Sequence, residues 1–164
     1  MKFKEGKTIG KLYIEKHGKK LEVVIRWPKR NDVVKIWKFY NKVIKETEFL
    51  SRITPVKLSD ERKFLRDMIN GIKKNDKIYI IAEHDGNIVG SVSVERTSME
   101  THRHVGIYGI CILKKYTSIG LGSKLTKHVL DTAKNQMKLE IVRLGVYHKN
   151  KIAQRLYKKF KFVY

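Results

Sequence analysis

Gly120 and Gly122 are separated by one residue. They lie between an apolar, strand-like run and a stretch whose apolar residues follow helical spacing. Small residues at such a junction let the backbone approach a ligand closely. The free N–H groups in the first turn of a helix, with the positive end of the helix dipole, can bind phosphate oxygens. Lys114, Lys115 and Lys124 add positive charge beside this segment. The pattern indicates a phosphate-binding loop, although a simple strand-to-helix turn would use the same glycines.

Two common nucleotide-binding motifs are excluded at this loop. G-x-G-x-x-G is absent, and so is G-x-x-x-x-G-K-[ST], because Gly122 is followed by Ser-Lys-Leu. A second signal is therefore needed before the loop can be assigned a ligand.

A second group of chemically useful residues lies toward the C-terminus. Asn150 suits the N-cap of a following helix, and its side chain can still face a ligand. Tyr157 carries a phenol, whose ordinary pKa of about 10 suits a proton donor. Ala153, Leu156 and Phe160 share one helical stripe with Tyr157, so packing in the core is the alternative role for this group.

Both segments resemble the GCN5-related N-acetyltransferase (GNAT) family. The coenzyme A signature of that family reads Gln/Arg-x-x-Gly-x-Gly/Ala, and residues 117–122 match it at both glycines. Thr117 stands in place of the Gln/Arg, which shortens a side-chain donor. Ser118 stands where many members have another glycine.

The C-terminal pattern of the family resembles Leu-x-Val-x-x-x-Asn-x-x-Ala-x-x-Leu-Tyr-x-Lys-x-Gly-Phe, which residues 144–162 follow closely. Lys161 stands in place of the late glycine. The other defined positions all match: Leu144, Val146, Asn150, Ala153, Leu156, Tyr157, Lys159 and Phe162. This agreement at fixed spacing is the more specific of the two signals, and the glycine loop supports it.

The resemblance implies an α/β (mixed α+β) GNAT acyl-CoA N-acyltransferase fold. Its central, mixed, mostly antiparallel sheet would be flanked by helices, with a V-shaped cofactor cleft between the strands at 104–113 and 139–147. Acetyl-CoA would be the co-substrate, a primary amine would attack its thioester directly, and Tyr157 would be the general acid. The implied cofactor-binding residues are Ile110, Cys111, Ile112, Thr117, Ser118, Ile119, Gly120, Leu121, Gly122, Ser123, Asn150, Ala153 and Tyr157.

The general base is less well defined. Many family members carry a glutamate on the strand before the glycine loop, whereas Gly106 occupies that place here. His104 is one catalytic candidate for the base, and a relay through water is another. His102, Tyr108 and Glu95 lie nearby.

The single cysteine and the six histidines indicate neither a nucleophile nor a metal. Cys111 lies in the middle of a predicted strand without an obvious histidine partner, as is typical of a buried, inert thiol. His102 and His104 are close together, but no H-x-x-x-H or Cys/His cluster accompanies them. We therefore expect no catalytic metal.

Hydrophobic periodicity and turn residues predict the elements that position these groups. In chain order they are a hairpin of 11–16 and 20–27 around His17-Gly18, a helix capped by Asn31 or Asp32, a loop at 48–58, a helix from Ser59, a hairpin of 77–83 and 88–95 around Asp85-Gly86, a strand at 104–113, a helix opened by Gly120, a strand at 139–147, a helix from Asn150 to about Phe160, and a short last strand to Tyr164. The acceptor amine would enter between the first two helices and the last strands, so the loop at 48–58 is expected to line its site.

The chain has 164 residues, of which 41% are apolar and 32% charged, as expected for one globular domain. We expect a single N-acetyltransferase domain over 1–164, with 11–16 as an extra N-terminal hairpin strand. The family usually adds another strand after the position of Phe162. Either a truncation or a second subunit would account for its absence here, so a homodimer is a possible assembly.

The charge is strongly positive: 37 Lys and Arg stand against 16 Asp and Glu, a net charge of +21. Such a field attracts polyanions. The basic residues are spread along the whole chain, so a diffusely charged surface is the alternative to a nucleic-acid face. The expected partner is an amine-bearing small molecule, or a peptide or protein N-terminus. The alternative function is a basic nucleic-acid-binding protein, or a non-catalytic coenzyme A binder on the same fold.

No stretch approaches the roughly 18 consecutive apolar residues of a membrane span, and the N-terminus lacks an apolar signal core. We therefore expect a cytoplasmic protein without a membrane partner.

Overall fold

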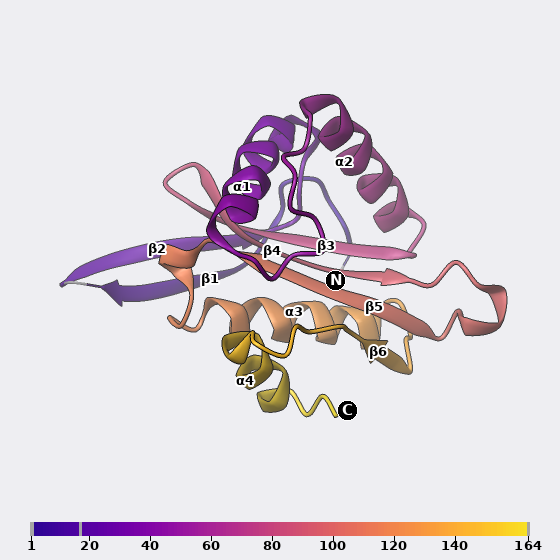
Figure 1. Ribbon diagram of the computed structural model, residues 1–164. Coiled ribbons are helices and arrows are strands. Elements are labelled where there is room, and N and C mark those ends of the chain that lie inside the picture. Colours follow the sequence, from indigo (N-terminus) through magenta and orange to yellow (C-terminus); the bar gives the residue numbers. More distant parts are fainter. Residues whose placement is uncertain (1, 17, 164) are drawn as a thin grey trace.

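The computed structural model describes residues 2–16 and 18–163 (Figure 1). Its strands form one six-stranded sheet in the order β1-β2-β3-β4-β5-β6. The helices and strands are β1 (Thr8–Lys16), β2 (Lys19–Arg26), α1 (Val33–Glu46), α2 (Leu58–Lys73), β3 (Lys77–His84), β4 (Asn87–Arg96), β5 (Val105–Ile112), α3 (Leu121–Asn135), β6 (Ile141–Arg143) and α4 (Lys151–Lys159).

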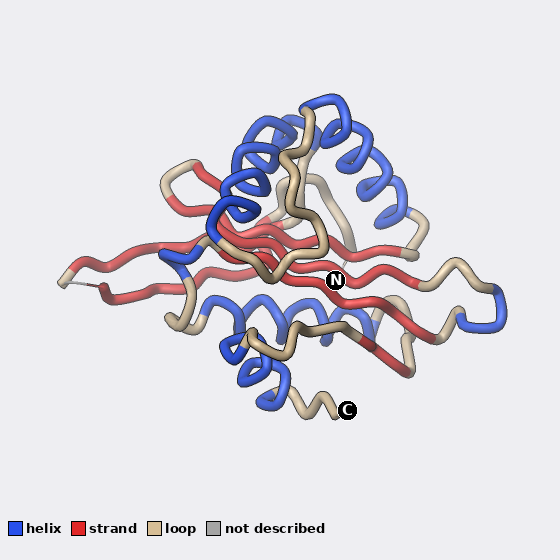
Figure 2. The backbone as a smooth tube through the Cα atoms, viewed as in Figure 1, coloured by secondary structure: helices blue, strands red, loops and turns tan. Residues whose placement is uncertain are grey.

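The sheet is mixed but mostly antiparallel. Neighbouring strands from β1 to β5 run antiparallel, and β6 runs parallel to β5. A parallel pair needs a crossover connection, which α3 supplies between β5 and β6. Helices α1 and α2 cover one face of the sheet, and α3 lies on the other face with α4 beside it (Figures 1 and 2). The predicted fold class is confirmed.

Both predicted hairpins form. Asp85 and Gly86 join β3 to β4 with φ values of 47° and 73°. These values fit a type I′ turn, which matches the twist of the strands and requires positive φ at both positions. Strands β1 and β2 make the other hairpin; His17, in its predicted turn, lies outside the described residues.

Packing of α3 against the sheet fixes the glycine loop at the end of β5. The predicted apolar stripe of α3 is buried throughout: Leu121, Leu125, Val129 and Ala133 are each no more than 1% exposed. Burial of each leucine or valine side chain contributes on the order of 2 kcal/mol of hydrophobic free energy. The first turn of α3 is therefore held rigidly beside the strand that precedes it.

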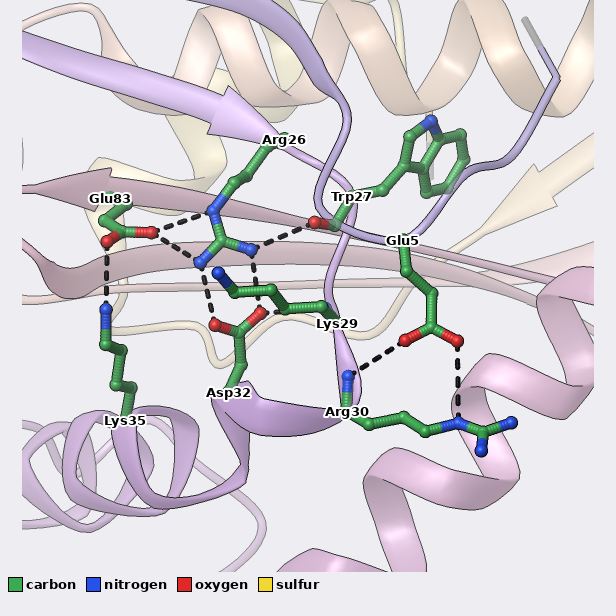
Figure 3. Close-up of polar contacts among 8 residues, drawn as sticks. All are labelled: Glu5, Arg26, Trp27, Lys29, Arg30, Asp32, Lys35 and Glu83. Atoms are coloured by element: carbon green, nitrogen blue, oxygen red, sulfur yellow. Dashed lines mark hydrogen bonds and ion pairs between the residues drawn. The ribbon is translucent and has the colours of Figure 1, made fainter.

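The start of α1 differs from the predicted capping arrangement. Asp32 occupies the N-cap position, but its carboxylate makes no cap bond to the helix. Its two oxygens instead accept hydrogen bonds from the Arg26 guanidinium at 2.7 and 2.8 Å, and one also accepts from the Lys29 N–H at 2.8 Å. Arg26 also donates to Glu83, which accepts from Lys35 as well (Figure 3). This network joins β2, β3 and α1.

The second helix begins one residue before the predicted start. Its first residue is Leu58, so Ser59 lies within the first turn, and Lys57 at the N-cap makes no side-chain cap bond. Asp60 and Glu61 follow in the same turn, where acidic side chains interact favourably with the helix dipole.

The strand predicted at 139–147 is shorter in the structure. Leu139 is buried in the core instead of extending the strand, and β6 covers only Ile141–Arg143. The chain then leaves β5, which opens the cleft described below.

The predicted last strand is wrong for the residues that the structure describes. Residues 161–163 form no strand. Lys161 takes a φ of 61° at the end of α4, and the Phe162 ring then packs beside the rings of Tyr108 and Tyr157. Tyr164 lies outside the described residues.

Candidate active site

The parallel pair of β5 and β6 separates along its length. Residues Val105, Gly106 and Ile107 pair with Ile141, Val142 and Arg143. Beyond them β5 continues to Ile112, while β6 has ended. Within the part of the chain that the structure describes, one edge of residues 108–112 therefore has no partner strand. Backbone groups on such an edge are available to a ligand.

Two adjoining cavities lie along this edge. One, of about 1030 Å³, extends from β5 to the first turn of α3 and the outer side of α4. The other, of about 770 Å³, lies between the sheet, α1, α2 and the inner side of α4. They meet at the residues that line both: Phe49, Leu50, Ile110, Cys111, Asn150 and Ala153.

The glycine loop lines the larger cavity. Gly120 has a φ of 88° and Ser118 a φ of 60°, the left-handed region that favours glycine. Ser118 therefore keeps the backbone conformation of the glycine that many family members have there. A Cβ on Gly122 would lie 3.3 Å from Leu156 Cδ2 and 3.4 Å from Ile112 Cδ1, so a larger residue would crowd the meeting point of α3, α4 and β5.

Most of the predicted cofactor residues line the cavities, and some do not. Ile110, Ile112, Thr117, Ser118, Ser123 and Asn150 are among those that line the larger one. Leu121 is fully buried in the core, and Ile119 packs against the core, so neither side chain reaches the cavity. The Thr117 hydroxyl donates to Lys114 O at 2.8 Å.

Asn150 takes the predicted N-cap position of α4. Its side-chain oxygen accepts a hydrogen bond from the Ala153 N–H at 3.1 Å, which fixes the first turn of the helix. At the other end of α4, Lys159 Nζ lies 3.1 Å from Ser123 Oγ. Helix α4 is thus tied to α3 across the larger cavity.

Tyr157 faces the smaller cavity. Its ring contacts those of Tyr108 and Phe162, and its hydroxyl makes no hydrogen bond with the residues that the structure describes. Burial raises the pKa of Tyr157 to about 12, so the phenol carries its proton at neutral pH.

Cys111 lies at the junction of the two cavities. Burial raises the pKa of its thiol to about 11, so it is uncharged at neutral pH. No group of three or more His, Cys, Asp or Glu side chains among the described residues could hold a metal ion. In the same part of the chain, no helix is both long and apolar enough to cross a membrane.

His104 is not brought together with Tyr157. It precedes β5, and its ring stacks on His102 with 6.3 Å between the ring centroids. It lines neither cavity. At about 3.3 Å per residue, roughly 13 Å of extended chain separate it from Tyr108, where the cleft opens.

The family position for a strand glutamate has no room for a side chain. A Cβ on Gly106 would lie 2.6 Å from Leu139 Cδ1 and 2.7 Å from Val94 Cγ1. Gly106 thus leaves no room for a side chain, and His104 lies outside both cavities.

Sequence reasoning missed an acidic residue of the smaller cavity. Glu61 was assigned only to the favourable first turn of α2, but it is 3% exposed and lines this cavity. One signal could have revealed it. Glu61, Leu65 and Met68 follow the spacing of the buried face of α2, so a carboxylate stands in an apolar stripe.

The sequence model of the Acetyltransferase (GNAT) family matches residues 31–162. The chain belongs to this family. The matched region begins after β2, so the hairpin of β1 and β2 lies before it.

Individual GNAT proteins show the same relationship. The L-amino acid N-acetyltransferase AaaT of Escherichia coli K12 is 26% identical over 83 residues, which are 51% of this chain and 51% of that enzyme. The match thus spans about half of that relative. A GNAT acetyltransferase structure from Streptococcus pneumoniae has a TM-score of 0.78 at 28% identity and covers 86% of this chain and 84% of its own.

A further acetyltransferase structure shares the fold. The structure of the acetyltransferase yncA from Salmonella typhimurium, described with its cofactor acetyl-CoA, has a TM-score of 0.75 at 18% identity. It covers 86% of this chain and 79% of its own.

Proposed function

We propose that the chain transfers the acetyl group of acetyl-CoA to a primary amine, which attacks the thioester directly. The observation that carries this proposal is the edge of β5 without a partner strand. That edge shares one cavity with the first turn of α3 and the other with Tyr157. A cofactor cavity and an acceptor cavity that meet at one strand edge are what such a two-substrate transfer requires.

The larger cavity suits coenzyme A. The first-turn N–H groups of α3 would bind the diphosphate, with the backbone of residues 117–123 around it. Leu121 and Ile119 would contribute only main-chain groups, because their side chains face the core. Lys114, Arg155 and Lys159 line the same cavity and complement the phosphate charge.

The edge of β5 suits the pantetheine arm. Its amides would pair with the free backbone of Ile110, Cys111 and Ile112, as an added strand would. Asn150 and Ala153 line both cavities and would contact the arm where it turns toward the acceptor.

Tyr157 suits the role of general acid. When bound, acetyl-CoA supplies an activated acetyl group on sulfur. The phenol of Tyr157, protonated at neutral pH, would donate its proton to the leaving thiolate. Its hydroxyl is not used in a hydrogen bond within the described chain, so it is available for that transfer.

The smaller cavity suits the acceptor. The loop between α1 and α2 lines it with Phe49, Leu50, Ser51 and Arg52, in agreement with the expected role of residues 48–58. The acceptor would be an amine-bearing small molecule, or a peptide or protein N-terminus. One curated relative is named for L-amino acids, so these belong among the first amines to assay.

The proposal is tested by titrating the protein with acetyl-CoA in a calorimeter and then measuring coenzyme A release against a panel of amines. The panel contains L-amino acids, arylalkylamines and peptides with free N-termini. Binding followed by amine-dependent release is the expected result. Absence of binding at millimolar acetyl-CoA would contradict the proposal, and binding without release from any amine would favour a non-catalytic coenzyme A binder.

A further inference from the structure

Glu61 is a buried carboxylate without a bonded counter-charge. It lies in the first turn of α2, is 3% exposed, and lines the smaller cavity. Asp32 is the other buried carboxylate among the described residues, and the Arg26 guanidinium binds both of its oxygens. No hydrogen bond or ion pair reaches the Glu61 carboxylate from the part of the chain that the structure describes.

An arrangement of this kind is costly for the fold. A buried carboxylate loses its hydration and normally regains the energy from hydrogen bonds or an ion pair. Burial raises the pKa of Glu61 to about 7, and the more distant charge of Arg52 only partly opposes this shift. Because no described residue bonds the carboxylate, a cation that enters the cavity would supply its missing counter-charge.

The surroundings of Glu61 suit an ammonium group on an apolar body. The rings of Phe64 and Tyr79 meet edge-on beside it, with 5.7 Å between their centroids, and Tyr40 faces the same cavity. Burial raises the pKa of both phenols, and the nearby charge of Glu61 raises it further. Aromatic faces attract ammonium groups, and they also pack against apolar carbon.

We propose that Glu61 is the acceptor-binding carboxylate of this enzyme: it binds the ammonium of a primary amine carried on an apolar or aromatic body and removes one proton from it. The proposal rests on the acetyl-transfer function proposed above. Glu61 and Tyr157 come from different helices, α2 and α4, and line one cavity. The acceptor nitrogen would lie between the two.

The proton transfers balance. An N–H bond of the ammonium breaks and an O–H bond forms on Glu61. The neutral amine then forms a C–N bond to the acetyl carbon while the C–S bond breaks, and the proton of Tyr157 passes to sulfur. The nitrogen returns a proton to Tyr157 as the amide forms, and Glu61 releases its proton to solvent.

The cavity disfavours acceptors with several positive charges. Arg52 lines it together with Glu61, and the chain carries a net charge of +21. A monoamine brings one charge to one carboxylate, whereas a polyamine brings further charges toward Arg52.

The first test measures amine binding without turnover. Phenethylamine is titrated at pH 8 into protein saturated with coenzyme A, for the wild type, Glu61→Gln and the control Asp67→Asn. Asp67 lies on the same helix and is exposed, outside both cavities. Loss of a charged hydrogen bond predicts at least about tenfold weaker binding in Glu61→Gln and no change in the control.

The outcomes separate the two proposals. Equal phenethylamine affinity in Glu61→Gln, or no binding to the wild type, overturns the role of Glu61. Acetyl-CoA binding is measured on the same three proteins and is expected to be equal in all of them. If the wild type does not bind acetyl-CoA, the proposed function falls, while phenethylamine titrated into the same proteins without coenzyme A still decides whether Glu61 binds the amine. Spermidine binding more tightly than phenethylamine overturns the assignment of an apolar monoamine.

The second test separates proton removal from binding. The titratable or charged groups around Glu61 are Tyr40 from α1, Arg52 from the preceding loop, Tyr79 from β3 and Asp60 from α2. The value of kcat/KM for phenethylamine is expected to fall below pH about 7 in the wild type and in Asp67→Asn. In Glu61→Gln this acid limb disappears, and kcat/KM is about 100-fold lower on its plateau. Glu61→Asp restores the limb. An unchanged acid limb in Glu61→Gln overturns the proton-transfer role.

Discussion

The ring of Tyr157 packs edge-on against the ring of Tyr108, with 5.7 Å between the centroids and 87° between the planes. Tyr108 is itself fixed, because its hydroxyl lies 2.8 Å from Thr126 Oγ1 on α3. The contact of the two rings thus places α4 relative to β5 and α3. It holds the Tyr157 ring by packing, while no hydrogen bond from the described residues engages the hydroxyl.

The Tyr157→Phe substitution separates these two roles. The phenylalanine ring keeps the contact with Tyr108, so stability and acetyl-CoA affinity are expected to stay close to wild type. Loss of the proton donor should lower kcat by about 100-fold or more. Steady-state kinetics with a working amine, together with calorimetric titration of acetyl-CoA, measure the two effects separately.

Tyr13→Phe is the matched control, because Tyr13 is an exposed tyrosine on β1. It should leave kcat unchanged. A Tyr157→Phe enzyme that turns over at the wild-type rate would remove Tyr157 from the mechanism.

Adding a methyl group at Gly120 tests the glycine loop without creating a steric contact. Gly120 has a φ of 88°, and a Cβ there would contact nothing within 4 Å. Gly120→Ala therefore costs about 1 kcal/mol through backbone conformation alone. If the loop relaxes and must be restored when the diphosphate binds, the same free energy makes acetyl-CoA binding about fivefold weaker.

Gly86→Ala provides the comparison. Gly86 has a φ of 73°, also with nothing within 4 Å, but it lies in the turn between β3 and β4. Both variants should lose similar stability in urea unfolding. Only Gly120→Ala should bind acetyl-CoA more weakly, and equal cofactor affinities would argue against a diphosphate site at the loop.

Glu61 makes a prediction about stability as well as activity. Its pKa is about 7 in the folded protein and about 4.5 in the unfolded chain, so folding takes up a proton between these values. Stability from this group is therefore present below pH about 4.5 and is lost as the pH rises to about 7. Glu61→Gln should melt higher than wild type at pH 8, and the difference should shrink as the pH falls toward 4.5. An equal difference at both pH values would show that Glu61 does not titrate in this range.

Sequence motifs predicted most of the residues that line the larger cavity, because two helix starts form much of its wall. The helix starts at Gly120 and Asn150 follow from local rules of capping and turns, and the structure places both in the larger cavity. The two residues that depart from the family's glycines also take positive φ values. Ser118 and Lys161 replace family glycines and keep φ values of 60° and 61°.

The smaller cavity could not be predicted in the same way, because it is assembled from distant segments. Gly106 excludes a side chain only because Leu139 and Val94 pack against it. Glu61 enters the site because its helix lies over the sheet, and His104 misses it because the cleft opens farther along β5. The late start of β6 likewise accompanies the burial of Leu139 in the core, which no local signal indicates.

The buried pair of Arg26 and Asp32 helps to hold α1, which lines the smaller cavity, because it joins the end of β2 to the start of α1. Asp32 is fully buried, so Asp32→Asn leaves the Arg26 charge without one of its two carboxylate partners and should destabilise the fold by about 3 kcal/mol. Glu83 remains as the other carboxylate partner of Arg26. Hydrogen bonds from Arg26 and Lys35 outweigh the effect of burial on Glu83 and lower its pKa. Stability from Glu83 is therefore present above pH about 4.5 and lost as the pH falls below that value. Urea unfolding at pH 7 measures the loss. Glu22→Gln, which removes the exposed ion pair with Lys11, is the control and should change little. A small effect of Asp32→Asn would mean that apolar packing alone holds α1 in place.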